Sequence, residues 1–266
     1  APSPKTAFRR RYGVIHDTQG PHVRLGVLWF VAVVASLALR DLRPYGLAVL
    51  YGTVAGVAAM QIVDCWHEVR GGADRWVAAL GASTMPVVAT AGTAPVGVVY
   101  LLLVALAVTA AIVSPDKRLP VLASAGHTVL AAGWCGGAAA SVVLLANYEI
   151  GAVIILIVYV MVYDACDYVV GSGASNGIEG PLAGAIFLVP ITALLATIHT
   201  PPFDGADIWS FAVLAMIAMP AGQILASALL PSATSRAPAL RRLDSLLIVG
   251  PAWAGLVGLY LTRAGG

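Results

Sequence analysis

Three carboxylates and a run of glycines follow a strongly apolar segment in the second half of the chain. The stretch Tyr163–Gly184 reads YDACDYVVGSGASNGIEGPLAG and contains Asp164, Asp167 and Glu179 but no basic residue. Carboxylate oxygens are ligands that Mg²⁺ prefers, and glycines at 171, 173 and 177 allow the tight turns that bind phosphate. Asp164 and Asp167 share a face if the preceding helix continues. The stretch predicts an acidic loop, either a metal and phosphate site or a solvated helix end.

A second segment, Ser232–Asp244, carries the complementary charge. It reads SATSRAPALRRLD, with Arg236, Arg241 and Arg242 and the single acid Asp244. Arginine binds phosphate oxygens through two parallel hydrogen bonds. An acidic segment beside a basic one would suit a metal–nucleotide substrate. We therefore expect the two segments to converge at one polar site on the cytoplasmic side.

Other polar groups favour a structural interpretation. Asp64, His67 and Glu68 share a helix face that could bind a metal, but they more simply form the polar end of a membrane helix. His127 and His199 have no obvious partner in the sequence. The three cysteines form no close pair, so neither a disulfide nor a zinc site is predicted.

The elements that must position these residues are membrane helices. The 266 residues are 59% hydrophobic and 11% charged, with a mean hydropathy of +0.88, whereas about a quarter of the residues in soluble domains are charged. Apolar runs of about 20 residues predict transmembrane helices. We predict an all-α, polytopic integral membrane helix bundle with about nine transmembrane helices. The predicted spans are 23–39, 44–63, 76–91, 95–113, 119–146, 150–163, 181–198, 208–231 and 245–262.

The basic residues predict which side of the membrane each connection faces. With a cytoplasmic N-terminus, 12 of the 15 Lys and Arg residues lie on inner segments and 3 on outer ones, as the positive-inside rule requires. We predict a basic cytoplasmic tail over 1–24, N-terminal transmembrane helices over 25–118 and a C-terminal transmembrane region over 119–266. The expected location is a bacterial-type inner or plasma membrane. A net charge of +2 is too small to indicate a nucleic-acid partner.

Two blocks in the C-terminal half resemble the phosphatidate cytidylyltransferase (CDP-diacylglycerol synthase) family. The first block follows the family order of an Asp, an aromatic residue, a Gly, a Ser, Glu-Gly and a further Gly, through Asp164 or Asp167, Tyr168, Gly171, Ser175, Glu179, Gly180 and Gly184. The second resembles the family's C-terminal signature, Asp-Arg-x-Asp-Ser-Leu before a last span with an early Pro, through Arg242, Asp244, Ser245, Leu246 and Pro251. Between the two blocks, Gly222 and Ser227 also agree.

The resemblance implies a reaction, a cofactor and a set of site residues. The phosphate of phosphatidic acid would attack the α-phosphorus of CTP, and pyrophosphate would leave while Mg²⁺ offsets the developing charge. Catalytic roles fall to Asp164, Asp167, Asp244 and Glu179, and the metal would be held by Asp164, Asp167 and Asp244. Substrate-binding roles fall to Arg241, Arg242, Tyr168, Gly171, Gly173, Ser175 and Ser245. The implied partners are a phospholipid, CTP, membrane lipids and a second copy of the chain.

The chain also departs from the family pattern. The family's Ser-Pro-x-Lys-Thr stretch is shortened to SNGIE without a lysine, and Gln223 and Ala226 stand where the family has acids. Arg241 occupies the position of the first signature Asp. Two alternatives to the enzyme therefore remain, a degenerate non-catalytic relative that binds lipid or a partner protein, and a small transporter. The low charge of the predicted spans disfavours the transporter.

Overall fold

The computed structural model describes residues 22–39, 43–69, 71–113, 119–172, 177–198 and 201–264. Within these residues every regular element is helical, which confirms the predicted all-α class. The described chain forms nine α-helices and one short 3₁₀ helix. In order they are α2 (His22–Ala38), α3 (Arg43–Val69), α4 (Arg75–Ala89), α5 (Thr93–Val113), α6 (Val121–Tyr148), α7 (Ile150–Gly171), α8 (Glu179–Thr197), α9 (Asp207–Leu229), η2 (Leu240–Arg242) and α10 (Leu246–Ala264).

Seven of the described helices, α3 and α5 to α10, are long and apolar enough to cross a membrane. This supports an integral membrane protein, and each of the nine predicted spans coincides with one helix. The two others are shorter, because α2 has 17 residues and α4 has 15. A helix of 15 residues is about 22 Å long, less than the hydrocarbon thickness of about 30 Å. Nine crossings therefore remain a prediction.

The predicted boundary that differs most from the structure is the end of α7. The sixth predicted span ends at residue 163, whereas α7 continues from Ile150 to Gly171. Glu149 begins the helix as its N-cap, because its carboxylate accepts a hydrogen bond from the Gly151 N–H at 3.2 Å. Asp164 and Asp167 therefore lie on a helix, and the predicted acidic loop is wrong as far as Gly171, because α7 includes these residues.

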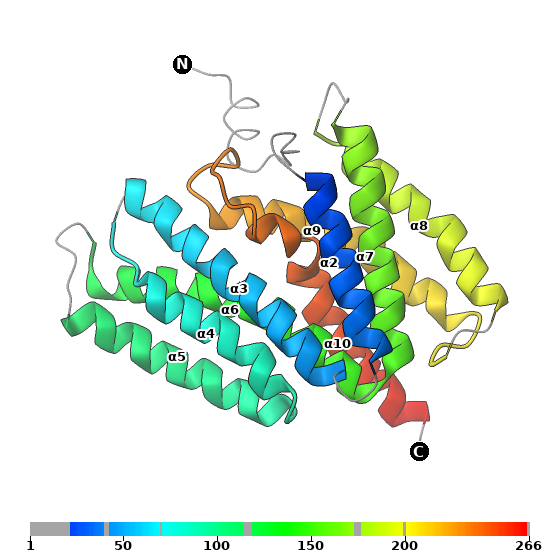
Figure 1. Cartoon of the computed structure of the whole chain (residues 1–266), viewed down its shortest axis with the longest axis horizontal. Helices are drawn as coiled ribbons and strands as arrows, with labels where there is room; N and C mark the ends of the chain where they lie inside the picture. The colour runs from blue at the N-terminus through cyan, green and yellow to red at the C-terminus, as the bar shows by residue number, and fades with distance from the viewer. Residues whose placement is uncertain are drawn as a thin grey trace.

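Successive helices run in opposite directions through the bundle. In Figure 1 the C-terminal ends of α3, α5 and α9 lie toward the left and that of α7 toward the top, whereas those of α4, α6, α8 and α10 lie toward the bottom or the right. The 3₁₀ helix η2 lies against α3 and α9. The acidic end of α7 and the arginines before α10 are thereby placed at the same end of the bundle.

Small residues allow the helices around α6 to pack closely. The central helix α6 contacts α3, α4, α5 and α10, while α7 packs against α8 and α8 against α9. A Cβ on Gly136 would lie 3.0 Å from the Cα atom of Ala82, and a Cβ on Gly52 would lie 3.0 Å from the carbonyl oxygen of Ser83. Glycine at such contacts lets helix backbones approach, as is common between membrane helices.

Candidate functional site

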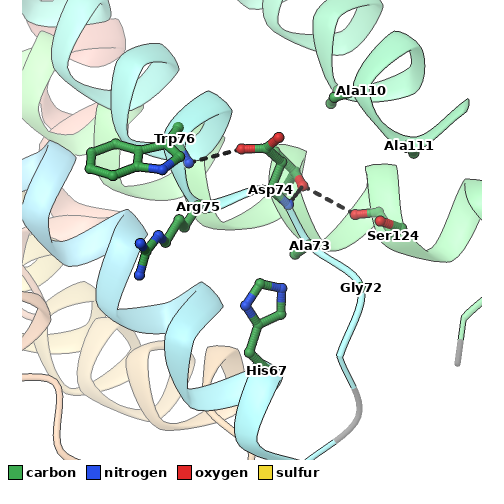
Figure 2. Close-up of a pocket in the computed structure, with 11 residues that line it drawn as sticks. His67, Gly72, Ala73, Asp74, Arg75, Trp76, Ala110, Ala111 and Ser124 are labelled. Carbon is green, nitrogen blue, oxygen red and sulfur yellow. Dashed lines mark hydrogen bonds between the residues drawn. The ribbon is translucent and has the colours of Figure 1, made fainter. Parts of the chain in front are cut away.

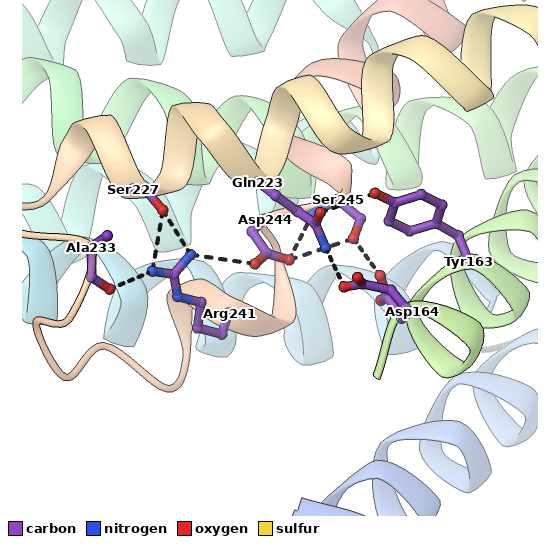
Figure 3. Close-up of polar contacts among 9 residues, drawn as sticks. Tyr163, Asp164, Gln223, Ser227, Ala233, Arg241, Asp244 and Ser245 are labelled. Atoms are coloured by element: carbon purple, nitrogen blue, oxygen red, sulfur yellow. Dashed lines mark hydrogen bonds and ion pairs between the residues drawn. The ribbon is translucent and has the colours of Figure 1, made fainter. Parts of the chain in front are cut away.

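The candidate site is a network of polar side chains that joins α7, α9 and the segment before α10 (Figure 3). Its centre is Ser245, whose hydroxyl group donates a hydrogen bond to the Asp164 carboxylate. The same hydroxyl lies 3.4 Å from Asp244 Oδ1, and the Ser245 N–H donates to that oxygen at 2.8 Å. One serine thus links two carboxylates that are 80 residues apart in the sequence. The two charged segments converge here, as the topology predicted.

Gln223 connects the second carboxylate of α7 to the network. The side chain lies on α9 and is buried. Its amide nitrogen donates to Asp167 Oδ2 at 2.8 Å, and its amide oxygen accepts from the Tyr163 hydroxyl at 2.9 Å. The sequence showed Gln223 only as the replacement of a family acid. A signal was available, since a polar side chain within an apolar helix needs a hydrogen-bonding partner.

Arg241 lies on the other side of Asp244. Its guanidinium group donates to the Ser227 hydroxyl at 3.3 and 3.4 Å and to the Ala233 carbonyl at 3.1 Å. Its Nη1 lies 3.7 Å from Asp244 Oδ2. Arg242, also half-buried, interacts electrostatically with Asp164. Both arginines predicted to bind phosphate therefore lie beside the carboxylates, and Arg241 is held there by protein groups.

Burial dominates the electrostatics of Asp244, which is 7% exposed. Desolvation raises its pKa above the ordinary value, while the positive charge of Arg241 and the hydrogen bonds from Ser245 act in the opposite direction. At an exposed position of the segment Ser232–Asp244 an asparagine would cost little stability. Asp244 is not exposed, because its side chain is enclosed between α9, η2 and α10.

Three glycines shared with the family pattern allow the helices to close around the network. A Cβ on Gly180 would lie 2.3 Å from Asp167 Oδ1, and a Cβ on Gly184 would lie 2.7 Å from the ring of Tyr163. A Cβ on Gly222 would lie 2.3 Å from the carbonyl oxygen of Asp244. All three distances are far below van der Waals contact, so each position excludes a larger residue without local movement.

The remaining predicted residues lie at the edge of this network or outside the described residues. Tyr168 is on the exposed side of α7, and Gly171 is the last residue of that helix. Glu179 is the first residue of α8, next to Gly180. Gly173 and Ser175 lie outside the described residues, as do residues 1–21 of the predicted tail.

The alternative metal face on α3 forms a polar helix end. Asp64 pairs with Arg75 at 3.8 Å, and both His67 and Glu68 are exposed. His127 stacks on Trp66 with ring centroids 5.2 Å apart. His199 lies outside the described residues.

The donor set of the network suits a hard divalent cation only in part. Among the described residues, no group of three or more His, Cys, Asp or Glu side chains is arranged to hold a metal ion. Asp164 and Asp244 share the Ser245 hydroxyl, whereas Asp167 faces the amide of Gln223. Mg²⁺ commonly takes one or two carboxylates and completes its shell with substrate phosphates and water. A site of two carboxylates would fit that requirement.

Comparison with known proteins adds no assignment. No family model matches the sequence, and the search of curated proteins finds no match.

Proposed function

We propose that this protein is a membrane-embedded nucleotidyltransferase that resembles phosphatidate cytidylyltransferases and forms CDP-diacylglycerol or a related activated lipid. The observation that carries the proposal is the link between Asp164 and Asp244 through the Ser245 hydroxyl. Two carboxylates and two arginines at one end of a membrane bundle provide ligands for a cation and for phosphate groups. By the positive-inside rule this end faces the cytoplasm, where nucleotides are available.

Each residue has a distinct role in this proposal. Asp164 and Asp244 would hold Mg²⁺, which offsets the negative charge of the reacting phosphates. Asp167 orients the network through Gln223 and would take up a ligand position only if that hydrogen bond broke. Arg242 and, after leaving Asp244, Arg241 would bind phosphate oxygens. Ser245 fixes the relative position of the two carboxylates, which matters because such transfers depend on positioning and electrostatic stabilisation.

The test is the formation of CDP-lipid from CTP and phosphatidate by the purified protein in detergent. We expect product with Mg²⁺ and none with EDTA. Asp164→Asn should reduce turnover by at least about 100-fold, the scale of one lost electrostatic contact in a transition state. Asp204→Asn, an exposed acid between α8 and α9, is the matched control and should retain activity. Thermal melting of each variant separates loss of activity from loss of folding.

A second candidate function is a non-catalytic lipid-binding or partner-binding protein that retains this fold. It is favoured by the contacts of Gln223 and Arg241, which already satisfy Asp167 and Asp244 without a metal. This function predicts no product with any nucleoside triphosphate and phospholipid offered. It also predicts that Mg²⁺ leaves the melting temperature of the wild-type protein unchanged, whereas binding to the folded state raises it.

A further inference from the structure

A cavity of about 410 Å³ lies away from the carboxylate network, between the ends of α3 and α5 and the beginnings of α4 and α6 (Figure 2). Neither the sequence nor the proposed function assigns it a role. Its walls differ in character. Ala107, Ala110 and Ala111 of α5 form an apolar side, while His67, Arg75 and Ser124 contribute polar groups.

The polar side of the cavity is held in place by hydrogen bonds that leave several donors available. Asp74 caps α4, because its Oδ1 accepts from the N–H groups of Trp76 and Val77 at 2.9 and 3.0 Å. The Asp74 N–H in turn donates to Thr128 Oγ1 on α6 at 3.0 Å. The Asp74 charge is thus directed at the helix end, where the partial positive charge of the backbone offsets it.

Ser124 is the observation that points to a ligand. The residue is only 8% exposed and lines the cavity. Its carbonyl oxygen accepts from Thr128, but its hydroxyl group has no hydrogen bond to any described residue. The Ser124 hydroxyl is open to the cavity, so a polar ligand there can accept its hydrogen bond.

The positive charge of Arg75 determines the charge of that ligand. Arg75 pairs with Asp64 at 3.8 Å while both side chains are about half exposed, 49% and 45%. An exposed ion pair of this length contributes little, so Arg75 can exchange Asp64 for another anion. Trp76 stacks under the guanidinium group at 5.0 Å and is 60% exposed. Tryptophan at such positions commonly marks the membrane–water interface.

We propose that this cavity is a binding site for a phosphate group, carried either by a membrane phospholipid or by a water-soluble phosphate ester. The phosphate accepts hydrogen bonds from Arg75, His67 and Ser124. The alanine side of α5 accommodates the apolar part of a lipid, which favours the phospholipid as the source. The site is separate from the carboxylate network. The outcome of a binding experiment at the cavity therefore does not decide the outcome of the CDP-lipid turnover assay, nor the reverse.

The experiment measures binding to the purified full-length protein in detergent by native mass spectrometry. Dioleoylphosphatidic acid, uncharged dioleoylglycerol and glycerol 3-phosphate are offered separately. We expect phosphatidic acid to bind and dioleoylglycerol not to bind, and glycerol 3-phosphate binds with similar affinity only if the ligand is a soluble ester. Arg75→Gln should weaken phosphate binding about tenfold, as expected for loss of a charge-assisted hydrogen bond. Arg263→Gln, in the last turn of α10, is the matched control and should bind as the wild type does.

A variant that fills the cavity gives a second measurement. Ala110→Phe should lower the number of phosphatidic acid molecules bound per protein by one at wild-type stability, because only the molecule in the cavity is lost. If the Ala110→Phe protein fails to fold, Arg75→Gln decides the question alone. Equal binding of phosphatidic acid and dioleoylglycerol would overturn the proposal. So would a folded Arg75→Gln protein that binds phosphatidic acid as tightly as Arg263→Gln, or failure of both phosphate compounds to bind.

Discussion

The contact between α9 and the segment before α10 at Gly222 leads to a quantitative prediction. A methyl group added here would lie 2.3 Å from the carbonyl oxygen of Asp244. Ordinary contacts begin at 3.4 Å, so the two backbones must separate by about 1 Å. Neither atom belongs to a flexible side chain that could rotate away. Gly222→Ala therefore moves Asp244 or bends α9.

The expected effect is a net loss of stability. Overpacking of this kind costs about 1–3 kcal/mol, while replacing a helical glycine by alanine contributes up to about 1 kcal/mol in the opposite direction. The free energy of unfolding should thus fall by roughly 1–2 kcal/mol. For a protein of this size that corresponds to a decrease in Tm of about 2–8 °C.

Thermal unfolding followed by tryptophan fluorescence in detergent measures this decrease. The control is Gly255→Ala on α10, because a Cβ at Gly255 has no heavy atom within 4 Å. This control variant should melt at the wild-type temperature or slightly above it. If Gly222→Ala and Gly255→Ala melt at the same temperature, the close approach of α9 to Asp244 is refuted.

Two further predictions concern the same network. Gln223→Met keeps the length of the side chain but removes the hydrogen bonds to Tyr163 and Asp167. Tm should fall, because each buried polar group left without that partner costs about 1–3 kcal/mol. An unchanged Tm would contradict the role of the amide. Burial raises the pKa of Asp244 from 3.8 to about 6, so its proton favours the folded state. Without divalent cations, the contribution of Asp244 to the free energy of unfolding should therefore decrease as pH rises from about 4 to 6 and then level off. Asp244→Asn cannot titrate and should lack this decrease, so a constant difference in Tm between the two proteins across this range would contradict the prediction.

The helices of the fold could be located from hydropathy because a membrane requires long, internally hydrogen-bonded apolar segments. The end of α7 could not be located from hydropathy. Hydropathy ends the span at the first acid, whereas the helix continues because Asp164 and Asp167 find partners on Ser245 and Gln223. Those partners are 81 and 56 residues away in the sequence, so only the packing of α9 and α10 against α7 reveals them.

The convergence of the charged segments was accessible from sequence, but their detailed contacts were not. The positive-inside rule placed the acids of α7 and the arginines before α10 on the same side. It could not show that Arg241 would be held by Ser227 and Ala233. The cavity at Ser124 was missed for a related reason, since the space there depends on small residues from α5 and α6 that carry no chemical signal of their own.

The charges of the network favour a structure that is stable with or without a bound cation. The network sets two arginines against three acids, Asp164, Asp167 and Asp244. The amide of Gln223 neutralises no charge, but it supplies a hydrogen-bond donor to Asp167. An acid in place of Gln223 would have added a fourth negative charge beside Asp167, which only a cation or a proton could offset. With the amide, the excess is a single negative charge when all three acids are ionised. The glutamine that weakens the resemblance to the cytidylyltransferases is thus also what lets three carboxylates lie together, two of them buried, before any metal or substrate binds.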